Sequence, residues 1–136
     1  MPHNIDWLIK DHVILLHISG DLLLEEIEAI NTELTELLQA GKPPVHLVAD
    51  VKELGKFPFD LISVRRASTY MQEPNLGMIA VYGTSRIAAS FAQLLTSLAG
   101  VRMRFVRDYS EALRALAPED ARIKALMDDG KVPTER

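Results

Sequence analysis

Two short segments hold the side chains best suited to binding or chemistry. One follows the apolar run VHLVADV at 45–51 and carries acids, lysines and phenylalanines; the other, GTSR at 83–86, follows the apolar run GMIAVY. Because working groups of α/β domains gather where buried strands end, both segments are candidate sites. The candidate interaction turn comprises Asp50, Lys52, Lys56, Phe57, Phe59 and Asp60, and the candidate anion or ligand loop comprises Gly83, Thr84, Ser85 and Arg86.

Each segment has a binding interpretation and a structural one. Asp50 ends a strand, where catalytic carboxylates occur, but an acid there also accepts hydrogen bonds from a turn. In GTSR, free N–H groups at a helix start can hold a phosphate or carboxylate. The segment has one glycine and matches neither nucleotide-binding fingerprint, so Ser85 also fits a simple helix cap. Asp60 likewise suits the positive end of a helix.

No catalytic centre, metal site or cofactor is predicted. The chain has no cysteine, no G-x-S-x-G turn and no S-x-x-K motif. The spacing of the histidines matches no metal motif, and we expect them to be ordinary surface or core residues. They are His3, His12, His17 and His46.

The composition is that of one ordinary globular domain. The chain has 136 residues and a formal net charge of -4, which gives no general attraction to nucleic acid or anionic lipid. It has no signal-peptide pattern and no apolar run of the ~20 residues that span a bilayer. With no cysteine, a reducing cytoplasm is the expected location. The expected partners are another protein, a second copy of the chain or a small ligand, with no nucleic acid and no stable membrane insertion.

Apolar periodicity predicts alternating strands and helices. Two short strands form an antiparallel pair across the turn at 10–12, and an acidic amphipathic helix follows. Two almost wholly apolar strands should be central, parallel and buried on both faces, whereas the alternating VRMRFV suits an edge strand. The predicted strands are 5–9, 13–19, 45–51, 77–82 and 101–106, and the predicted helices start near 24, 60, 86, 108 and 118.

This order predicts an α/β fold, a mostly parallel sheet of about five strands with an antiparallel N-terminal edge strand and four to five helices. The domain is expected over 1–117, followed by a short helix and a loose tail over 118–136. The second helix is expected over 60–71. The third helix is expected to turn Ile87, Phe91, Leu94, Leu95 and Leu98 inward.

Four segments together resemble the SpoIIAA-like branch of the STAS fold, named after sulfate transporters and anti-sigma-factor antagonists. They are HISGDLLLEEIEAI, VHLVADVKELGKFPFD, LGMIAVYGTS and VRMRFVRDYSEALRAL, and the resemblance covers about residues 5–117. In the antagonists, a kinase phosphorylates a serine at the start of the helix after the third strand. That motif corresponds here to PFDL at 58–61, where Asp60 stands near the expected serine. Ser63 lies a helical turn further on, and the phosphosite is not transferred to it.

The resemblance and the residues leave two hypotheses open. The first is a non-enzymatic regulatory module that docks a protein through the loop at 52–60 and the second helix. The second is a carrier or sensor of a small anion or lipid-like ligand, as the branch's similarity to lipid-transfer domains implies. Its pocket would lie near Gly83–Ser85, Asp50, Phe57 and Phe59, at the carboxyl end of the parallel strands.

Overall fold

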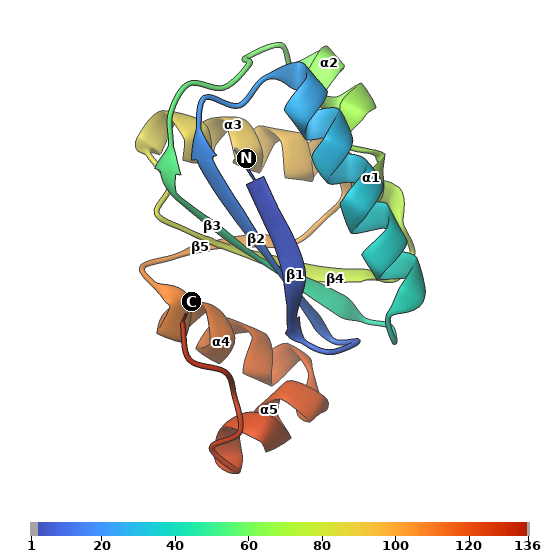
Figure 1. Cartoon of the computed structure of the whole chain (residues 1–136), viewed down its shortest axis with the longest axis vertical. Coiled ribbons are helices and arrows are strands. Elements are labelled where there is room, and N and C mark those ends of the chain that lie inside the picture. Colours follow the sequence, from blue (N-terminus) through green and yellow to red (C-terminus); the bar gives the residue numbers. More distant parts are fainter. Residues whose placement is uncertain (1–2, 136) are drawn as a thin grey trace.

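The computed structural model describes residues 3–135, which form one five-stranded sheet in the order β1-β2-β3-β4-β5 (Figure 1). β1 runs antiparallel to β2 and all other neighbours are parallel. The predicted α/β fold is therefore confirmed, including the N-terminal hairpin and the edge position of β5. The strands are β1 (His3–Ile9), β2 (Val13–Gly20), β3 (Val45–Leu54), β4 (Leu76–Tyr82) and β5 (Met103–Val106).

Helices cover the two faces of the sheet in two separate layers (Figure 1). One layer contains α1 (Leu24–Ala40), α2 (Leu61–Ala67), the 3₁₀ turn η1 (Thr69–Gln72) and α3 (Arg86–Ala99). The other contains α4 (Tyr109–Leu116), the 3₁₀ turn η2 (Ala117–Glu119) and α5 (Ala121–Asp128). The sheet thus separates an α1–α3 face from an α4–α5 face.

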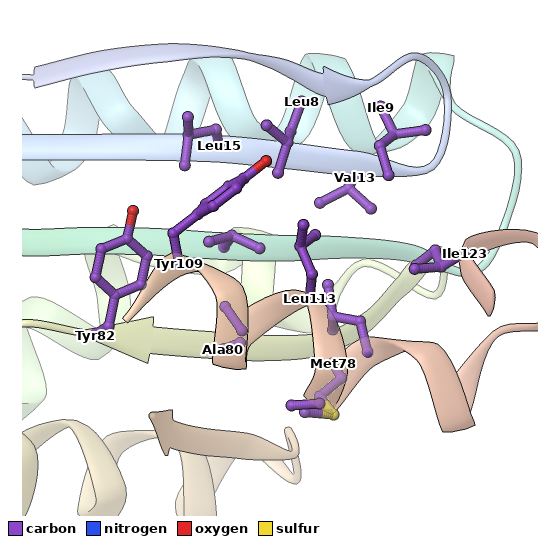
Figure 2. Close-up of a cluster of buried hydrophobic side chains, with 14 residues drawn as sticks. Leu8, Ile9, Val13, Leu15, Met78, Ala80, Tyr82, Tyr109, Leu113 and Ile123 are labelled. Carbon is purple, nitrogen blue, oxygen red and sulfur yellow. The ribbon is translucent and has the colours of Figure 1, made fainter. Parts of the chain in front are cut away.

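Alternation along β3 sends successive side chains to opposite layers. Leu47 and Ala49 pack with α1, while Val48 packs with α4. Figure 2 shows the core on the α4–α5 face, where Leu113 and Ile123 meet side chains of β1, β2 and β4. Strands β2 to β4 are covered on both faces, which is why their sequences are almost continuously apolar.

The segment predicted as one helix over 60–71 is broken at Ser68. Ser68 leaves helical geometry with φ -110° and ψ 48°, and the chain continues as η1. The side-chain oxygen of Asn31 accepts a hydrogen bond from the backbone N–H of Tyr70 at 2.7 Å. A contact from α1 therefore stabilises the break, which local periodicity could not reveal.

The orientation of α3 also corrects the prediction. Its buried residues are Ala88, Leu95 and Thr96, whereas Ile87, Leu94 and Leu98 are exposed. On a helix of 3.6 residues per turn, Ile87, Leu94 and Leu98 form one stripe, roughly 100° from the stripe that faces the sheet. Both stripes are apolar, so periodicity alone could not decide which of them turns inward.

The prediction of a loose C-terminal tail is also corrected. Val132 packs against the core under α4, and the backbone oxygen of Pro133 accepts a hydrogen bond from the Tyr109 hydroxyl at 2.6 Å. Arg136 lies outside the described residues.

A buried polar contact attaches α5 to the sheet. The His46 ring accepts a hydrogen bond from the backbone N–H of Met78 at Nδ1 (3.0 Å), so its Nε2–H donates to Asp120 at 3.1 Å. Asp120 also caps α5 and accepts from the Arg122 guanidinium at 2.7 Å. Burial raises the pKa of the Asp120 carboxyl, but hydrogen bonds from Arg122 and His46 outweigh it and set the pKa to about 2.

Replacing Asp120 with alanine should lower the free energy of unfolding by about 2–4 kcal/mol, because a buried N–H of His46 loses its acceptor and α5 loses its cap. Urea unfolding measures this loss. Asp128→Ala, in the same helix but exposed, should change stability by no more than about 0.5 kcal/mol. Equal effects of the two substitutions would contradict the assigned role of Asp120.

Stability should also fall as the pH drops below about 6.5, the ordinary histidine pKa. Burial lowers the pKa of His46 in the folded protein, so the unfolded chain binds more protons and acid favours it. Burial and the nearby Arg122 lower the pKa of His12 in the same direction. Urea unfolding at pH 7.5 and 5.5 should show the loss, and His46→Gln, which keeps a donor and an acceptor but cannot titrate, should reduce it. A pH dependence unchanged by His46→Gln would rule out His46 as its source.

Candidate functional site

The two candidate segments lie side by side at the carboxyl end of the parallel strands. Gly83 follows β4 with φ +81°, and a Cβ atom there would lie 2.3–2.7 Å from atoms of Lys52. A pocket is lined by Lys52, Phe57 and Gly83–Ser85. The structure thus brings Lys52 and Phe57 of the turn next to the Gly83–Ser85 loop, while Asp50 lies on the other face of the sheet.

Asp50 belongs to a polar cluster on the α4–α5 face. Strand register pairs Asp50 with His17 on β2 and with Tyr82 on β4. The carboxylate of Asp50 lies 3.1 Å from His17 Nδ1 and 3.7 Å from Lys52 Nζ, and also accepts from the Lys52 backbone N–H. Asp50 is therefore occupied as an acceptor, and it does not line the same space as Phe57 and Thr84.

The C-terminal tail completes this cluster. The Glu135 carboxylate lies 3.2 Å from Lys52 Nζ and accepts from the Tyr82 hydroxyl at 3.3 Å. Burial, followed by the charges of Asp50 and Glu135, raises the pKa of the Tyr82 phenol, which stays neutral. The hydrogen bond to Glu135, with help from Asp50, raises the pKa of Lys52. Sequence reasoning missed His17 and Glu135, because their proximity depends on register and on the returning tail.

The interaction turn is built around three aromatic rings. Before them in the chain, the backbone N–H of Lys56 donates a hydrogen bond to Asp21 at 2.9 Å. Phe57 and Phe59 lie 4.5 Å apart, and Phe91 of α3 lies 5.7 Å and 6.0 Å from them (ring centroids). Asp60 then caps α2, accepting from the Ser63 backbone N–H at 3.3 Å and from its hydroxyl at 2.7 Å. Hydrogen bonds from Ser63 lower the pKa of Asp60, which keeps its charge.

Three residues of the anion or ligand loop, Thr84, Ser85 and Arg86, differ in their surroundings. Ser85 caps α3 by accepting from the Ala88 backbone N–H at 3.2 Å. Thr84 Oγ1 is buried and has no hydrogen-bond partner among residues 3–135. Arg86 is exposed at the first position of α3. Ser85 therefore acts as a helix cap, whereas Thr84 Oγ1 is a buried polar atom without a hydrogen-bond partner in the described residues.

An exposed apolar surface covers α2, α3 and the end of the turn. Its members, here called the apolar face, are Phe59 (62% exposed), Ile62 (64%), Ile87 (64%), Leu94 (52%) and Leu98 (47%). Large exposed apolar side chains that gather on neighbouring elements make this surface a candidate interaction site.

Positive charge lies on the two helices that carry the apolar face. α2 and α3 hold three arginines, Arg65, Arg66 and Arg86, and no acid, in a chain whose total charge is -4. Arg65, Arg66 and Arg86 are exposed on α2 and α3, and within residues 3–135 none of the three has an ion-pair partner. These three guanidinium groups are free to meet an external carboxylate.

A cavity lies beneath the apolar face, between the sheet and α1, α2 and α3. It measures about 170 Å³ and its walls are almost entirely apolar. The inner side of α3 contributes Ala88 and Ala92, small residues that leave the space unfilled.

Among residues 3–135, no set of three or more acidic, histidine or cysteine side chains is placed to hold a metal ion. In the same part of the chain, no helix combines the length and apolar content needed to cross a bilayer.

Two solved structures share this architecture. The chain is similar to an uncharacterized protein of the DUF3478 family with a SpoIIAA-like fold from Shewanella loihica PV-4, with a TM-score of 0.61, 17% identity, and coverage of 84% of this chain and 91% of that one. It is also similar to the anti-sigma factor antagonist SpoIIAA in its unphosphorylated form, with a TM-score of 0.60, 12% identity, and coverage of 85% and 96%. No family model and no curated protein matches the chain. The chain therefore has the SpoIIAA-like, or STAS, fold, as its sequence segments predicted.

The contact between the two loops should be sensitive to Gly83. Gly83→Ala combines a left-handed backbone with a steric clash against Lys52, whereas Gly100→Ala, at φ +72°, meets no atom within 4 Å. Gly100→Ala should cost about 1–2 kcal/mol from the backbone alone, and Gly83→Ala distinctly more. Urea unfolding of both variants checks this order; equal losses would show that the loops do not touch.

Proposed function

We propose that this chain is a non-enzymatic, cytoplasmic protein-interaction module of the STAS type. Its apolar face docks an amphipathic helix that carries acidic residues beside its apolar seam. The observation that carries the proposal is the outward orientation of the large apolar residues of α3.

The spacing on α3 suits a helical partner. Ile87, Leu94 and Leu98 follow one another at intervals of seven and four residues, which places them on one stripe that can pack against another helix. Phe59 and Ile62 widen this stripe from the side of α2, with the ring contacts of Phe57 and Phe91 holding the turn against α3. A helix laid on such a surface is recognised through anchors at these intervals.

Charge favours an acidic partner over a second copy of the chain. A symmetric dimer through the apolar face would bring the unpaired Arg65, Arg66 and Arg86 of one copy toward those of the other, and like charges oppose such contact. Carboxylates beside the seam of a different partner would meet these guanidinium groups in charge-assisted hydrogen bonds.

The likeness to an anti-sigma factor antagonist supports a regulatory role through a protein partner. The proposed module lacks the phosphorylatable serine expected at 58–61, and Asp60 there serves as the α2 cap. We infer that docking is not controlled by phosphorylation at that position. The polar groups near the strand ends are engaged with one another, which supports a binding rather than a catalytic role.

Photo-crosslinking in the native cells tests the proposal. A benzophenone amino acid at Ile62 or Leu94 should form an adduct with a second polypeptide, and the same group at Glu28, on the outer side of α1, should not. Mass spectrometry should locate the crosslink in an acidic amphipathic helix. Adducts only to copies of this chain, or equal adducts from Glu28, would refute the assigned partner.

Substitutions should then weaken binding of the identified partner without unfolding the module. Leu94→Ser should raise Kd about tenfold or more, because the buried contacts of an anchor are lost. Arg65→Glu with Arg66→Glu should act in the same direction, while Arg114→Glu, exposed on the opposite face, should not. Isothermal titration calorimetry measures Kd, and melting curves verify folding. Binding unaffected by all of these changes would place the interface elsewhere.

A further inference from the structure

We propose that the cavity beneath α2 and α3 is a binding site for a small, mostly apolar molecule with a single hydrogen-bonding group. The site is distinct from the apolar face, which lies on the outer side of the same helices, and it does not depend on the docking function.

The size and walls of the cavity set the class of ligand. Its volume of about 170 Å³ is close to that of apolar protein cavities that take up benzene-sized molecules. Aliphatic and aromatic side chains from the sheet, α1, α2 and α3 surround it, including Leu47, Ile79 and Phe91. A ring or an alkyl chain of about six carbons matches this space.

Thr84 gives the site a polar point of recognition. It lines the cavity, and its Oγ1 is buried without a hydrogen-bond partner in the described residues. Buried hydroxyl groups are normally satisfied, so an unsatisfied one beside an apolar cavity points to a partner supplied from outside the chain. A ligand hydroxyl or carbonyl would satisfy it. The Tyr70 ring also lines the cavity, and burial raises the pKa of its phenol, so the walls carry no charge from this residue.

Two alanines of α3 explain why the space exists. Ala88 and Ala92 line the cavity between the larger Phe91 and Leu95, while Ile87 and Leu94 face solvent. Larger side chains at the two alanine positions would fill the cavity. The arrangement is thus consistent with a volume kept open for a ligand.

The methionines provide a site-specific measurement. Met71 and Met103 line the cavity, whereas Met78 and Met127 pack on the α4–α5 face. In the full chain labelled at methionine methyl groups, titration with phenol, 1-hexanol or toluene should shift the NMR signals of Met71 and Met103 and leave those of Met78 and Met127 in place. No shift of Met71 and Met103 up to the solubility limit of all three probes, or uniform shifts of all four, would overturn the proposal.

Two variants test the assigned contacts. Ala92→Leu should fill the cavity, abolish the Met71 and Met103 shifts and raise the melting temperature, while Ala29→Leu on the exposed side of α1 should leave binding intact. Ala88→Leu repeats the test if Ala92→Leu does not fold.

Phenol should bind roughly fivefold more tightly than toluene, and Thr84→Val should remove that preference. Unchanged binding in the filled variants would refute the site, and an unchanged preference in Thr84→Val would refute the role of Thr84.

Discussion

Burial of the parallel strands on both faces is the constraint on which the rest of the structure depends. The strand interiors have no contact with water, so helices must cover each side, and the connections between strands and helices must reach the surface at the ends of the sheet. This places the turn after β3 and the loop after β4 next to each other, with Gly83 against Lys52. It also divides the polar groups there, because alternation sends Asp50 to one layer and its neighbours Ala49 and Val51 to the other.

The two layers are held in different ways. The α4–α5 layer has a continuous apolar core (Figure 2), and the buried His46–Asp120 hydrogen bond attaches α5 to it. The α1–α3 layer is less completely packed, because Ala88 and Ala92 on the inner side of α3 leave a cavity beside the buried Leu95. The outer side of the same helix carries the large side chains of the apolar face. Binding surfaces commonly occur in the part of a fold that is least fully packed.

The sequence predicted most of the architecture, because strand burial and helix periodicity are local signals. The central strands 45–51 and 77–82, the edge strand and the Asp108 cap agree with the structure. Three features depended on contacts distant in sequence. The break at Ser68 needs Asn31, the placement of the tail needs Tyr109, and the His17–Asp50–Tyr82 cluster needs the strand register. The prediction of which side of α3 faces inward failed for another reason, since two adjacent apolar stripes gave no local basis for choosing between them.

Both proposals depend on the outward orientation of α3, and the absence of native cysteine allows a direct measurement of it. Single cysteines can replace Ile87, Leu94 or Leu98 on the outer stripe, and Ala88 or Leu95 on the inner one. Under native conditions the outer cysteines should react with a thiol reagent at nearly the rate of an unfolded chain, and the inner cysteines only as the domain unfolds. Rapid labelling at 88 and 95 with protection at 87, 94 and 98 would contradict the account.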